Sequence, residues 1–245
     1  MGLKEGTLES LIMNRSGLSV ATLVFDDMLQ AIDCLASKNI IHRDVKPENI
    51  LYTTLPDGQY QFQLGDFGLC NRTVNAFTYA GTPIYMAPEM FQKAKQTHKV
   101  DVWSLFVTML WTLDIRNFRK MANEFKSIAD VQNAVLSAAL DEQVAQIREM
   151  AIVNPEERAS AAQMLVKCFD GKGLSTPRNK VPALIDRPAI VTTATTRSPT
   201  AATTKPLARK RGVQKNTDQY RVEKSRNAVP VRPQRQAHSP GTENC

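Results

Sequence analysis

Four polar side chains of this sequence could carry out chemistry together. Asp44, Lys46 and Asn49 lie in one short stretch of the chain, and Asp66 follows in an Asp-Phe-Gly triplet. A carboxylate can accept the proton of a hydroxyl group, an ammonium group can neutralise phosphate oxygens, and amide and carboxylate oxygens are ligands that suit Mg²⁺. Moving the γ-phosphoryl group of MgATP to a hydroxyl group requires this combination of groups.

The elements that would position these side chains can be predicted from turn signals and strand-forming residues. Residues 50–52 and 61–64 look like two short strands joined by a turn at Pro56-Asp57-Gly58. The first three polar side chains lie on the loop before this strand pair, and Asp66 lies on the loop after it. A hairpin would therefore bring the two loops together.

Helical periodicity is clearest just before the first of these loops. Ser19 can cap a helix whose apolar residues recur at helical spacing as far as Leu35, and Asn39 ends the run. Residues 100–113 are apolar on nearly every side, which indicates a helix buried all round. The remaining predictions are a short helix over 7–12, a long functional loop over 66–89, and two helices over about 127–150 and 159–169.

Charge divides the chain into two unequal parts. Residues 1–170 contain 16 Lys and Arg and 20 Asp and Glu, a net charge of −4, whereas residues 171–245 contain 15 and 4, a net charge of +11. The second part also holds 8 of the 13 prolines, so it cannot offset a backbone entropy cost of about 1–2 kcal/mol per residue by burying apolar surface. We predict an α+β, mainly α-helical domain over residues 1–170 and a disordered basic tail over residues 171–245.

Cysteine usage and hydropathy suggest the cellular compartment. Cys34, Cys70, Cys168 and Cys245 are scattered, without the spacing of a disulfide framework or a metal site, as expected of free thiols in a reducing compartment. No run of about 20 apolar residues is present. We expect a soluble protein without membrane contact, located in the cytoplasm, with the nucleus as an alternative.

A resemblance to a known family rests on four motifs that occur in a fixed order. They are His42-Arg43-Asp44 with Lys46-Pro47-Glu48-Asn49, Asp66-Phe67-Gly68, Ala87-Pro88-Glu89, and Asp101-Val102-Trp103-Ser104. Each motif alone is weak, but together they resemble the catalytic, lower lobe of the eukaryotic serine/threonine protein kinases. The resemblance covers about residues 1–170 and implies a mainly helical lobe with a short β-hairpin at the catalytic loop.

The resemblance implies a role for each of the polar residues. Asp44 would orient the substrate hydroxyl group and take its proton, and Lys46 would contact the γ-phosphate of ATP. Asn49 and Asp66 would bind Mg²⁺ and the phosphates, and Leu51 would form the floor of the adenine site. The implied reaction transfers the γ-phosphoryl group of MgATP to Ser and Thr hydroxyl groups of protein substrates.

Further positions resemble regulatory and selectivity residues. Arg43 would bind a phosphate on the activation loop, and Thr78 would carry that phosphate after modification by an upstream kinase. A plain loop threonine at Thr78 is the competing interpretation. Thr82 would hydrogen-bond Asp44 and Lys46 and favour Ser and Thr acceptors over Tyr.

Supporting positions follow the same pattern, with two departures. Glu89 and Arg158 would form a buried ion pair that braces the lobe, and Asp101 would lie on the buried helix that carries the catalytic loop. Phe106 stands where the family usually has glycine, which implies local repacking. Residues 114–118 replace the usual Gly-x-x-Pro-Phe, which puts the docking of substrates or regulators on the next helix in doubt.

The upper lobe of a complete kinase is not visible in the sequence. No Gly-x-Gly-x-x-Gly motif occurs, and six residues precede the first predicted helix. We therefore expect the phosphate-gripping lysine of the upper lobe to be missing. Either the chain is a truncated form of a full kinase, or it is a natural half-kinase that acts as a protein-binding module or scaffold.

The tail contains three kinds of candidate interaction signal. Arg209-Lys210-Arg211 is a basic cluster that an import receptor could bind, although a solvated charge run is the simpler interpretation. Thr176-Pro177, Ser198-Pro199 and Ser239-Pro240 could accept proline-directed phosphorylation. We do not expect nucleic-acid binding beyond an electrostatic contact, because no aromatic residues alternate with the basic ones.

Overall fold

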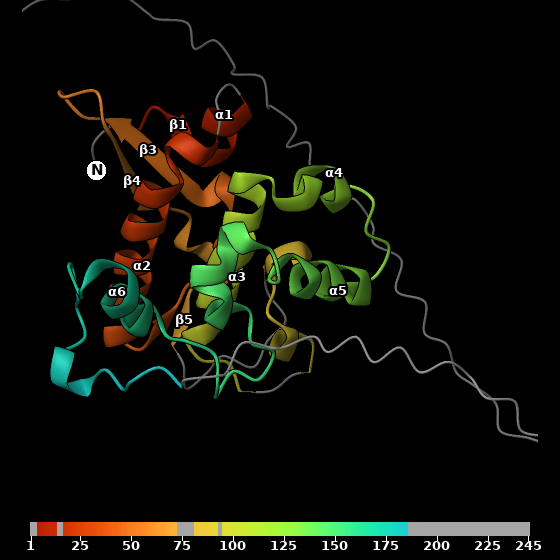
Figure 1. Cartoon of the computed structure of the whole chain (residues 1–245). Helices are drawn as coiled ribbons and strands as arrows, with labels where there is room; N and C mark the ends of the chain where they lie inside the picture. The colour runs from red at the N-terminus through yellow and green to blue at the C-terminus, as the bar shows by residue number, and fades with distance from the viewer. Residues whose placement is uncertain (1–3, 14–16, 73–80, 93–94, 186–245) are drawn as a thin grey trace, which may run out of the picture. The chain divides into compact units, whose positions relative to one another are not determined.

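The structure of the chain, a computed structural model, describes residues 4–13, 17–72, 81–92 and 95–185 (Figure 1). The α-helices of this part are α1 (Leu8–Met13), α2 (Ala21–Ser37), α3 (Lys99–Leu113), α4 (Phe118–Ala122), α5 (Ile128–Ala138) and α6 (Ala161–Phe169). The strands are β1 (Gly6–Thr7), β2 (Ile40–Ile41), β3 (Ile50–Thr54), β4 (Tyr60–Leu64) and β5 (Asn71–Arg72). The predicted fold class, a mainly α-helical α+β domain, is confirmed.

The predicted hairpin is present and is extended by a third strand. β3 and β4 pair antiparallel from Ile50 opposite Leu64 to Thr54 opposite Tyr60. β1 pairs antiparallel with the other edge of β3, so the sheet order is β1-β3-β4. A separate two-stranded sheet joins β2 to β5 and ties the chain just before the catalytic loop to the chain that follows Asp-Phe-Gly.

Two helices form the centre of the described fold. α2 packs against β4, α3 and α6, as Figure 1 also shows. α3 is buried along nearly its whole length, as its apolar composition predicts, and its Leu105 and Phe106 are fully buried. Fully burying a large apolar side chain contributes about 1.5–3 kcal/mol, so α3 is a rigid base for the loops attached to it.

The start of α2 differs from the predicted cap. Ser19 is the last residue of a 3₁₀ turn over Gly17–Ser19, and the N-cap position belongs to Val20, whose side chain makes no capping hydrogen bond. The backbone N–H of Val20 bonds to the carbonyl of Gly17 at 3.2 Å, which continues the 3₁₀ turn into the helix. The N-cap position of α2 is therefore Val20, one residue later than the Ser19 cap that we expected.

The helix predicted over 127–150 is divided in two. Ser127 and Asp130 form a capping box at the start of α5, which ends at Ala138. A 3₁₀ helix over Glu142–Ala151 then begins with the Asp141 carboxylate accepting a hydrogen bond from the N–H of Gln143. An aspartate side chain that bonds the backbone ahead of it competes with helix continuation, which explains the break.

The corner between α3 and α4 is made by residues in the left-handed conformation. Asp114, Arg116 and Asn117 have φ angles of 53°, 52° and 61°. Asp114 accepts a hydrogen bond from the N–H of Arg119 at 3.0 Å, and Phe118 is fully buried. The departure from Gly-x-x-Pro-Phe therefore keeps a buried aromatic residue and reaches it through a strained corner.

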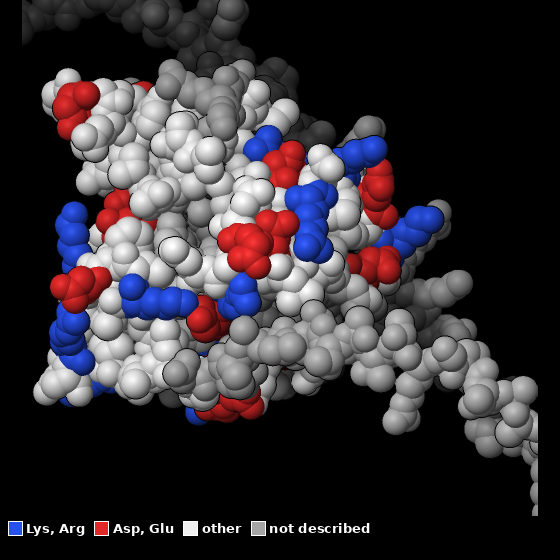
Figure 2. All heavy atoms as spheres, viewed as in Figure 1, with Lys and Arg blue, Asp and Glu red and all other residues white. Residues whose placement is uncertain are grey.

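The described fold continues past the boundary that we placed at residue 170. Residues 171–185 fold back on the domain, with Leu174 and Leu184 packed against its core. Residues 186–245 lie outside the described residues, as do Thr78 and Arg209-Lys210-Arg211. In the described residues, no helix is both long and apolar enough to cross a membrane. Acidic and basic side chains are interspersed over the face seen in Figure 2.

Candidate active site

The loop that carries the candidate catalytic residues is hydrogen-bonded to α3 through one carboxylate. Asp101 Oδ2 accepts a hydrogen bond from the N–H of His42, and its Oδ1 accepts one from the N–H of Arg43, both at 2.8 Å. Asp101 is fully buried, and this burial raises its pKa to about 6 against the two hydrogen bonds, which lower it. Arg43, at φ 71°, is the left-handed residue that turns the chain toward Asp44.

Asp44, Lys46, Asn49 and Thr82 form one hydrogen-bonded cluster. Asp44 Oδ2 lies 2.8 Å from Lys46 Nζ and accepts a hydrogen bond from Asn49 Nδ2 at 2.9 Å. Asp44 Oδ1 accepts hydrogen bonds from the N–H and hydroxyl of Thr82, at 3.1 and 2.9 Å. Lys46 Nζ also donates to Thr82 Oγ1 at 2.7 Å. Four donors therefore hold the Asp44 carboxylate in a fixed orientation.

The cluster sets the protonation state of Asp44. Burial alone would raise its pKa, but the hydrogen bond and charge of Lys46, together with Thr82 and Asn49, outweigh burial and hold the pKa below its ordinary value of 3.8. Asp44 is only 7% exposed. The carboxylate is thus ionised at neutral pH and shielded from bulk water, as an acceptor for a substrate hydroxyl group would need to be.

Thr82 reaches the cluster because the residue before it is glycine. Gly81 has φ +119°, and a Cβ atom at this position would lie 2.4 Å from the carbonyl oxygen of Arg43. Only glycine allows the chain to return this close to the catalytic loop. No role was predicted for Gly81, although the glycine directly before Thr82 was a usable signal.

Asp66 is placed beside this cluster through the backbone. The N–H of Gly65 donates to the carbonyl of Asn49 at 2.8 Å, so the next residue, Asp66, lies close to Asn49. Asp66 is left-handed, with φ 52°, and its Oδ1 accepts a hydrogen bond from the N–H of Gly68 at 3.2 Å. Among the described residues, the Asp66 side chain bonds to the N–H of Gly68 and not to Asp44, Lys46 or Thr82, so Asp66 stands apart from the hydrogen-bonded cluster.

The oxygen atoms of Asn49 and Asp66 are of the chemical kind that suits a magnesium ion. Asn49 directs its amide nitrogen at the backbone carbonyl and side chain of Asp44, each at 2.9 Å, which leaves its Oδ1 atom as a ligand. Within the described chain, no group of three His, Cys, Asp or Glu side chains is placed to hold a metal. Mg²⁺ does not need such a group, because it usually takes one or two carboxylates and completes its shell with water and substrate phosphates.

His42 and Phe67 lie behind the site. His42 is fully buried, and its Nε2 lies 2.9 Å from the Gly65 carbonyl oxygen, to which it must donate. Burial lowers its pKa, despite the opposing charges of Asp44 and Asp66. Phe67 contacts the His42 ring edge-on at 5.0 Å and is 47% exposed. A neutral His42 is therefore a packing and positioning group.

The structure also places the remaining predicted residues of this region. Leu51 lies on β3, and a Cβ atom at Gly65 would meet its Cδ1 at 2.9 Å, so its side chain covers the turn that precedes Asp66. Arg43 is buried, and its Nε donates to the Leu69 carbonyl oxygen at 2.9 Å. The contact between Leu51 and Gly65 was missed in the sequence, where the glycine just before Asp-Phe-Gly was the available signal.

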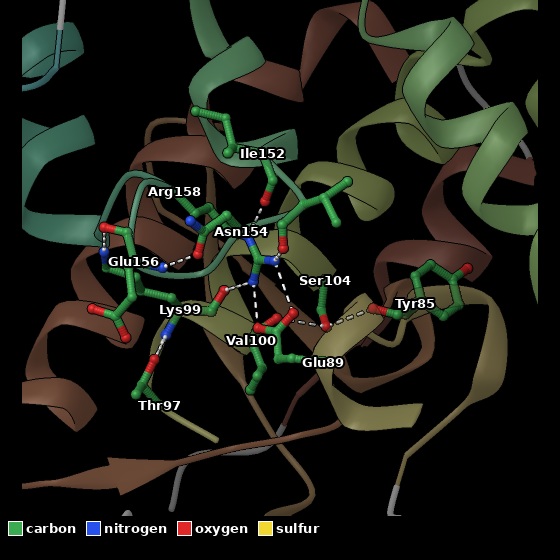
Figure 3. Close-up of polar contacts among 11 residues, drawn as sticks. Tyr85, Glu89, Thr97, Lys99, Val100, Ser104, Ile152, Asn154, Glu156 and Arg158 are labelled. Atoms are coloured by element: carbon green, nitrogen blue, oxygen red, sulfur yellow. Dashed lines mark hydrogen bonds and ion pairs between the residues drawn. The ribbon is translucent and has the colours of Figure 1, made fainter. Parts of the chain in front are cut away.

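Glu89 and Arg158 form a buried ion pair (Figure 3). Arg158 donates to both carboxylate oxygens of Glu89, at 2.7 and 2.9 Å, and both side chains are buried. The same guanidinium donates to the carbonyl oxygens of Ile152, Lys99 and Val153, at 2.8, 2.9 and 3.1 Å. Five hydrogen bonds from one side chain join the segment after the activation loop, the start of α3 and the loop before α6.

Comparison with known proteins identifies the family. The family model for the protein kinase domain matches residues 3–169. The chain is 34% identical over 149 residues to the serine/threonine-protein kinase DCLK1 of Rattus norvegicus. The matched region covers 57% of this chain and 34% of the rat protein. For DCLK2 of Homo sapiens the identity is 32% over 152 residues, covering 57% and 20%. For the probable serine/threonine-protein kinase nek3 of Dictyostelium discoideum it is 30% over 162 residues, covering 62% and 14%.

The chain therefore belongs to the protein kinase family, and the relatives that it resembles are serine/threonine-protein kinases. The mainly helical fold with its small antiparallel sheet agrees with the lower lobe of such a kinase. The chain spans about a third or less of the length of these curated relatives.

Proposed function

We propose that this chain is the catalytic lower lobe of a serine/threonine protein kinase, which transfers the γ-phosphoryl group of MgATP to Ser and Thr hydroxyl groups of proteins. The observation that carries the proposal is the cage around Asp44. Lys46, Asn49 and Thr82 hold an ionised carboxylate that is shielded from water at the edge of a loop fixed to α3. A structural role alone would not require a lysine and a threonine bonded to each other and to the same carboxylate.

Each side chain has a defined part in the proposed reaction. Asp44 orients the acceptor hydroxyl group and takes its proton, while Thr82 and Asn49 keep the carboxylate in place. Lys46, whose ammonium group is held by Thr82, would contact a phosphate oxygen of bound ATP. Bound MgATP supplies the phosphoryl group and the metal that neutralises its charge, and the oxygen atoms of Asn49 and Asp66 would hold that metal.

Regulation and location belong to the same proposal. A phosphate on the activation loop, with Thr78 as the proposed acceptor for an upstream kinase, would bind Arg43, which already reaches the chain after Asp-Phe-Gly at Leu69. The protein would act in the cytoplasm, and Arg209-Lys210-Arg211 would serve as an import signal for the nucleus.

A phosphoryl-transfer assay tests the proposal. The chain is joined to the upper lobe of a related kinase and incubated with radiolabelled MgATP and peptides that offer Ser or Thr. Asp44→Asn should lower the rate by about 10²–10⁴-fold, because the acceptor of the hydroxyl proton is lost. Asp57→Asn, the same change in the exposed turn between β3 and β4, is the control and should leave the rate unchanged. Equal rates for Asp44→Asn and the unmodified chain would refute the assignment.

A second candidate function is a protein-binding module without catalysis. Phe67 and Leu69 favour it, because they expose 47% and 38% of their surface next to the candidate site, where a partner could cover them. Titration of the isolated chain with MgATP separates the two functions. Tight binding that disappears in Asp66→Asn supports the enzyme, whereas no binding by the chain, with or without an upper lobe, supports the module.

A further inference from the structure

The segment that follows α6 is fastened to α2 by one buried carboxylate. Asp33 lies on α2 and is 1% exposed. Its Oδ2 accepts hydrogen bonds from the N–H groups of Ser175 and Thr176, at 2.8 and 2.9 Å, and its Oδ1 accepts one from the Thr176 hydroxyl at 2.6 Å. Within the described residues these are all the hydrogen bonds of this carboxylate. A buried carboxylate without donors is unfavourable, so Asp33 and this segment depend on each other.

Residues 175–185, which we call the strap, line one side of a cavity on the domain. The strap is held a second time where Gln163 of α6 donates to the carbonyl oxygens of Pro182 and Ala183, both at 3.1 Å. Beneath it lies a cavity of about 390 Å³, whose lining includes Asp33, His98, Lys99, Thr176 and Leu184. The strap therefore forms one wall of this cavity, and Asp33 holds the first two residues of that wall.

The residue that makes two of the three bonds to Asp33 belongs to a Thr-Pro dipeptide. Thr176 is partly exposed and Pro177 is exposed. We propose that Thr176 is a phosphorylation site for a proline-directed protein kinase, and that a phosphate there releases the strap from Asp33. This inference goes beyond the proposed function, because it concerns a modification of this chain by another enzyme.

The reaction and its consequence follow from the contacts. A bond forms between Thr176 Oγ1 and the γ-phosphorus of ATP, the bond from that phosphorus to the bridging oxygen of ADP breaks, and the hydroxyl proton passes to the base of the modifying kinase. The donor to Asp33 Oδ1 is then lost, and a group of charge about −1.5 to −2 replaces it beside a buried carboxylate. Lys99 faces the same cavity, but its Nζ already donates to the Glu156 carbonyl oxygen at 3.0 Å.

The experiment uses the full chain, a purified proline-directed protein kinase and MgATP. Mass spectrometry locates the phosphate, and Ser198-Pro199 and Ser239-Pro240 report in the same sample that the added kinase is active. Pro177→Ala should remove the phosphate from Thr176 and leave it at the two serines. In the phosphorylated chain, the amides of Ser175 and Thr176 should exchange hydrogen about tenfold faster or more, because their charge-assisted bonds to Asp33 are broken.

Two control variants, Thr176→Val and Asp33→Asn, separate the effect of the phosphate from the loss of the hydroxyl group and from poor access to the site. Thr176→Val removes the hydroxyl group without adding charge and should speed exchange less than phosphorylation does. If the two serines gain phosphate but Thr176 gains none, even in Asp33→Asn where the strap is already loosened, the site is wrong. If Thr176 is phosphorylated and the two amides exchange no faster, the release is wrong. The outcome does not depend on whether this chain is an active kinase, because the modifying kinase is added.

Discussion

Asp44 and Asp101 are both shielded from water, yet their pKa values move in opposite directions. At Asp44 the ammonium group of Lys46 helps to outweigh the effect of burial, whereas the hydrogen bonds that Asp101 accepts within the described part of the chain come from two backbone N–H groups. The first carboxylate is thereby kept ionised for chemistry. The second holds the catalytic loop, at the cost of a carboxyl group that keeps its proton up to about pH 6.

The raised pKa of Asp101 predicts a pH dependence of stability. Because the folded-state pKa of about 6 lies above the ordinary value of 3.8, the stability contributed by this group is fully present below about pH 3.8 and is lost as the pH rises through 6. The difference in free energy of unfolding between the unmodified chain and Asp101→Asn should therefore shrink on going from pH 4.5 to pH 7, by on the order of 1–3 kcal/mol. Urea denaturation at a series of pH values measures it, and a difference that grows with pH would contradict the prediction.

Arg158 should be far more sensitive to substitution than an exposed arginine. Arg158→Lys loses the paired contact with Glu89 and several carbonyl contacts, and it leaves a buried carboxylate poorly compensated, so it should cost about 3–5 kcal/mol of unfolding free energy. Arg178→Lys is the matched control, because the side chains of Arg178 and its partner Asp170 are 58% and 95% exposed. That change should stay within about 0.5 kcal/mol. Similar losses for both variants in chemical denaturation would show that burial of the pair is not decisive.

At the scale of the elements, the sequence pattern predicted helices and strands correctly where a whole element, or one face of it, is buried. The all-round apolar run gave α3, and the turn signal gave the hairpin of β3 and β4. The helix break before Glu142 and the hydrogen bonds between Asp33 and Thr176 were not predictable in this way. Both arise from a polar side chain that bonds a particular backbone group. In the case of Asp33 and Thr176, the two residues are also far apart in the sequence.

The corner between α3 and α4 can be relieved of strain by glycine. Asn117 is exposed and left-handed, at φ 61°, and its side chain makes no capping hydrogen bond to α4. Asn117→Gly should therefore raise the free energy of unfolding by up to about 1 kcal/mol, and Asn117→Ala should lower it by about the same amount.

The matched control for this corner is Asn123, at the end of α4. Its backbone is right-handed, with φ −84°, so Asn123→Gly should destabilise the chain by about 0.5–1 kcal/mol. Thermal or urea denaturation of the three variants provides the measurement. The explanation by backbone strain fails if glycine is unfavourable at both positions.

At the scale of the whole molecule, the kinase-like part and the excess of positive charge lie in different parts of the chain. The family model matches residues 3–169, and the positive charge lies after residue 185. Residues 186–245 contain 12 Lys and Arg against 4 Asp and Glu, a net charge of +8, so residues 1–185 carry a net charge of −1. The four residues of the candidate site could be found from the sequence because the family motif is local. The predicted hairpin brings Asp66 toward Asn49, but the bond from the N–H of Gly65 to the Asn49 carbonyl, which fixes this approach, could not be predicted.

The charge asymmetry predicts how the chain meets polyanions. The full chain should elute from immobilised heparin at a clearly higher salt concentration than a chain that ends at residue 185, because Lys and Arg that contact a polyanion release its counterions. A chain in which Arg209, Lys210 and Arg211 are replaced by glutamine should elute between the two. Coincident elution of all three would assign polyanion binding to the folded domain and refute the prediction.

The left-handed corner after α3 belongs to a long stretch without glycine. Between Gly81 and Gly171 every position has a side chain, and those that are left-handed among the described residues of this stretch are Asp114, Arg116, Asn117 and Asp170. Side chains narrow the range of backbone conformations open to the denatured polypeptide, so this half of the domain forfeits less disorder when it folds than a glycine-containing version would. The left-handed turns cost conformational energy in the folded state. The lower entropy of the unfolded chain offsets part of that cost, independently of any native contact.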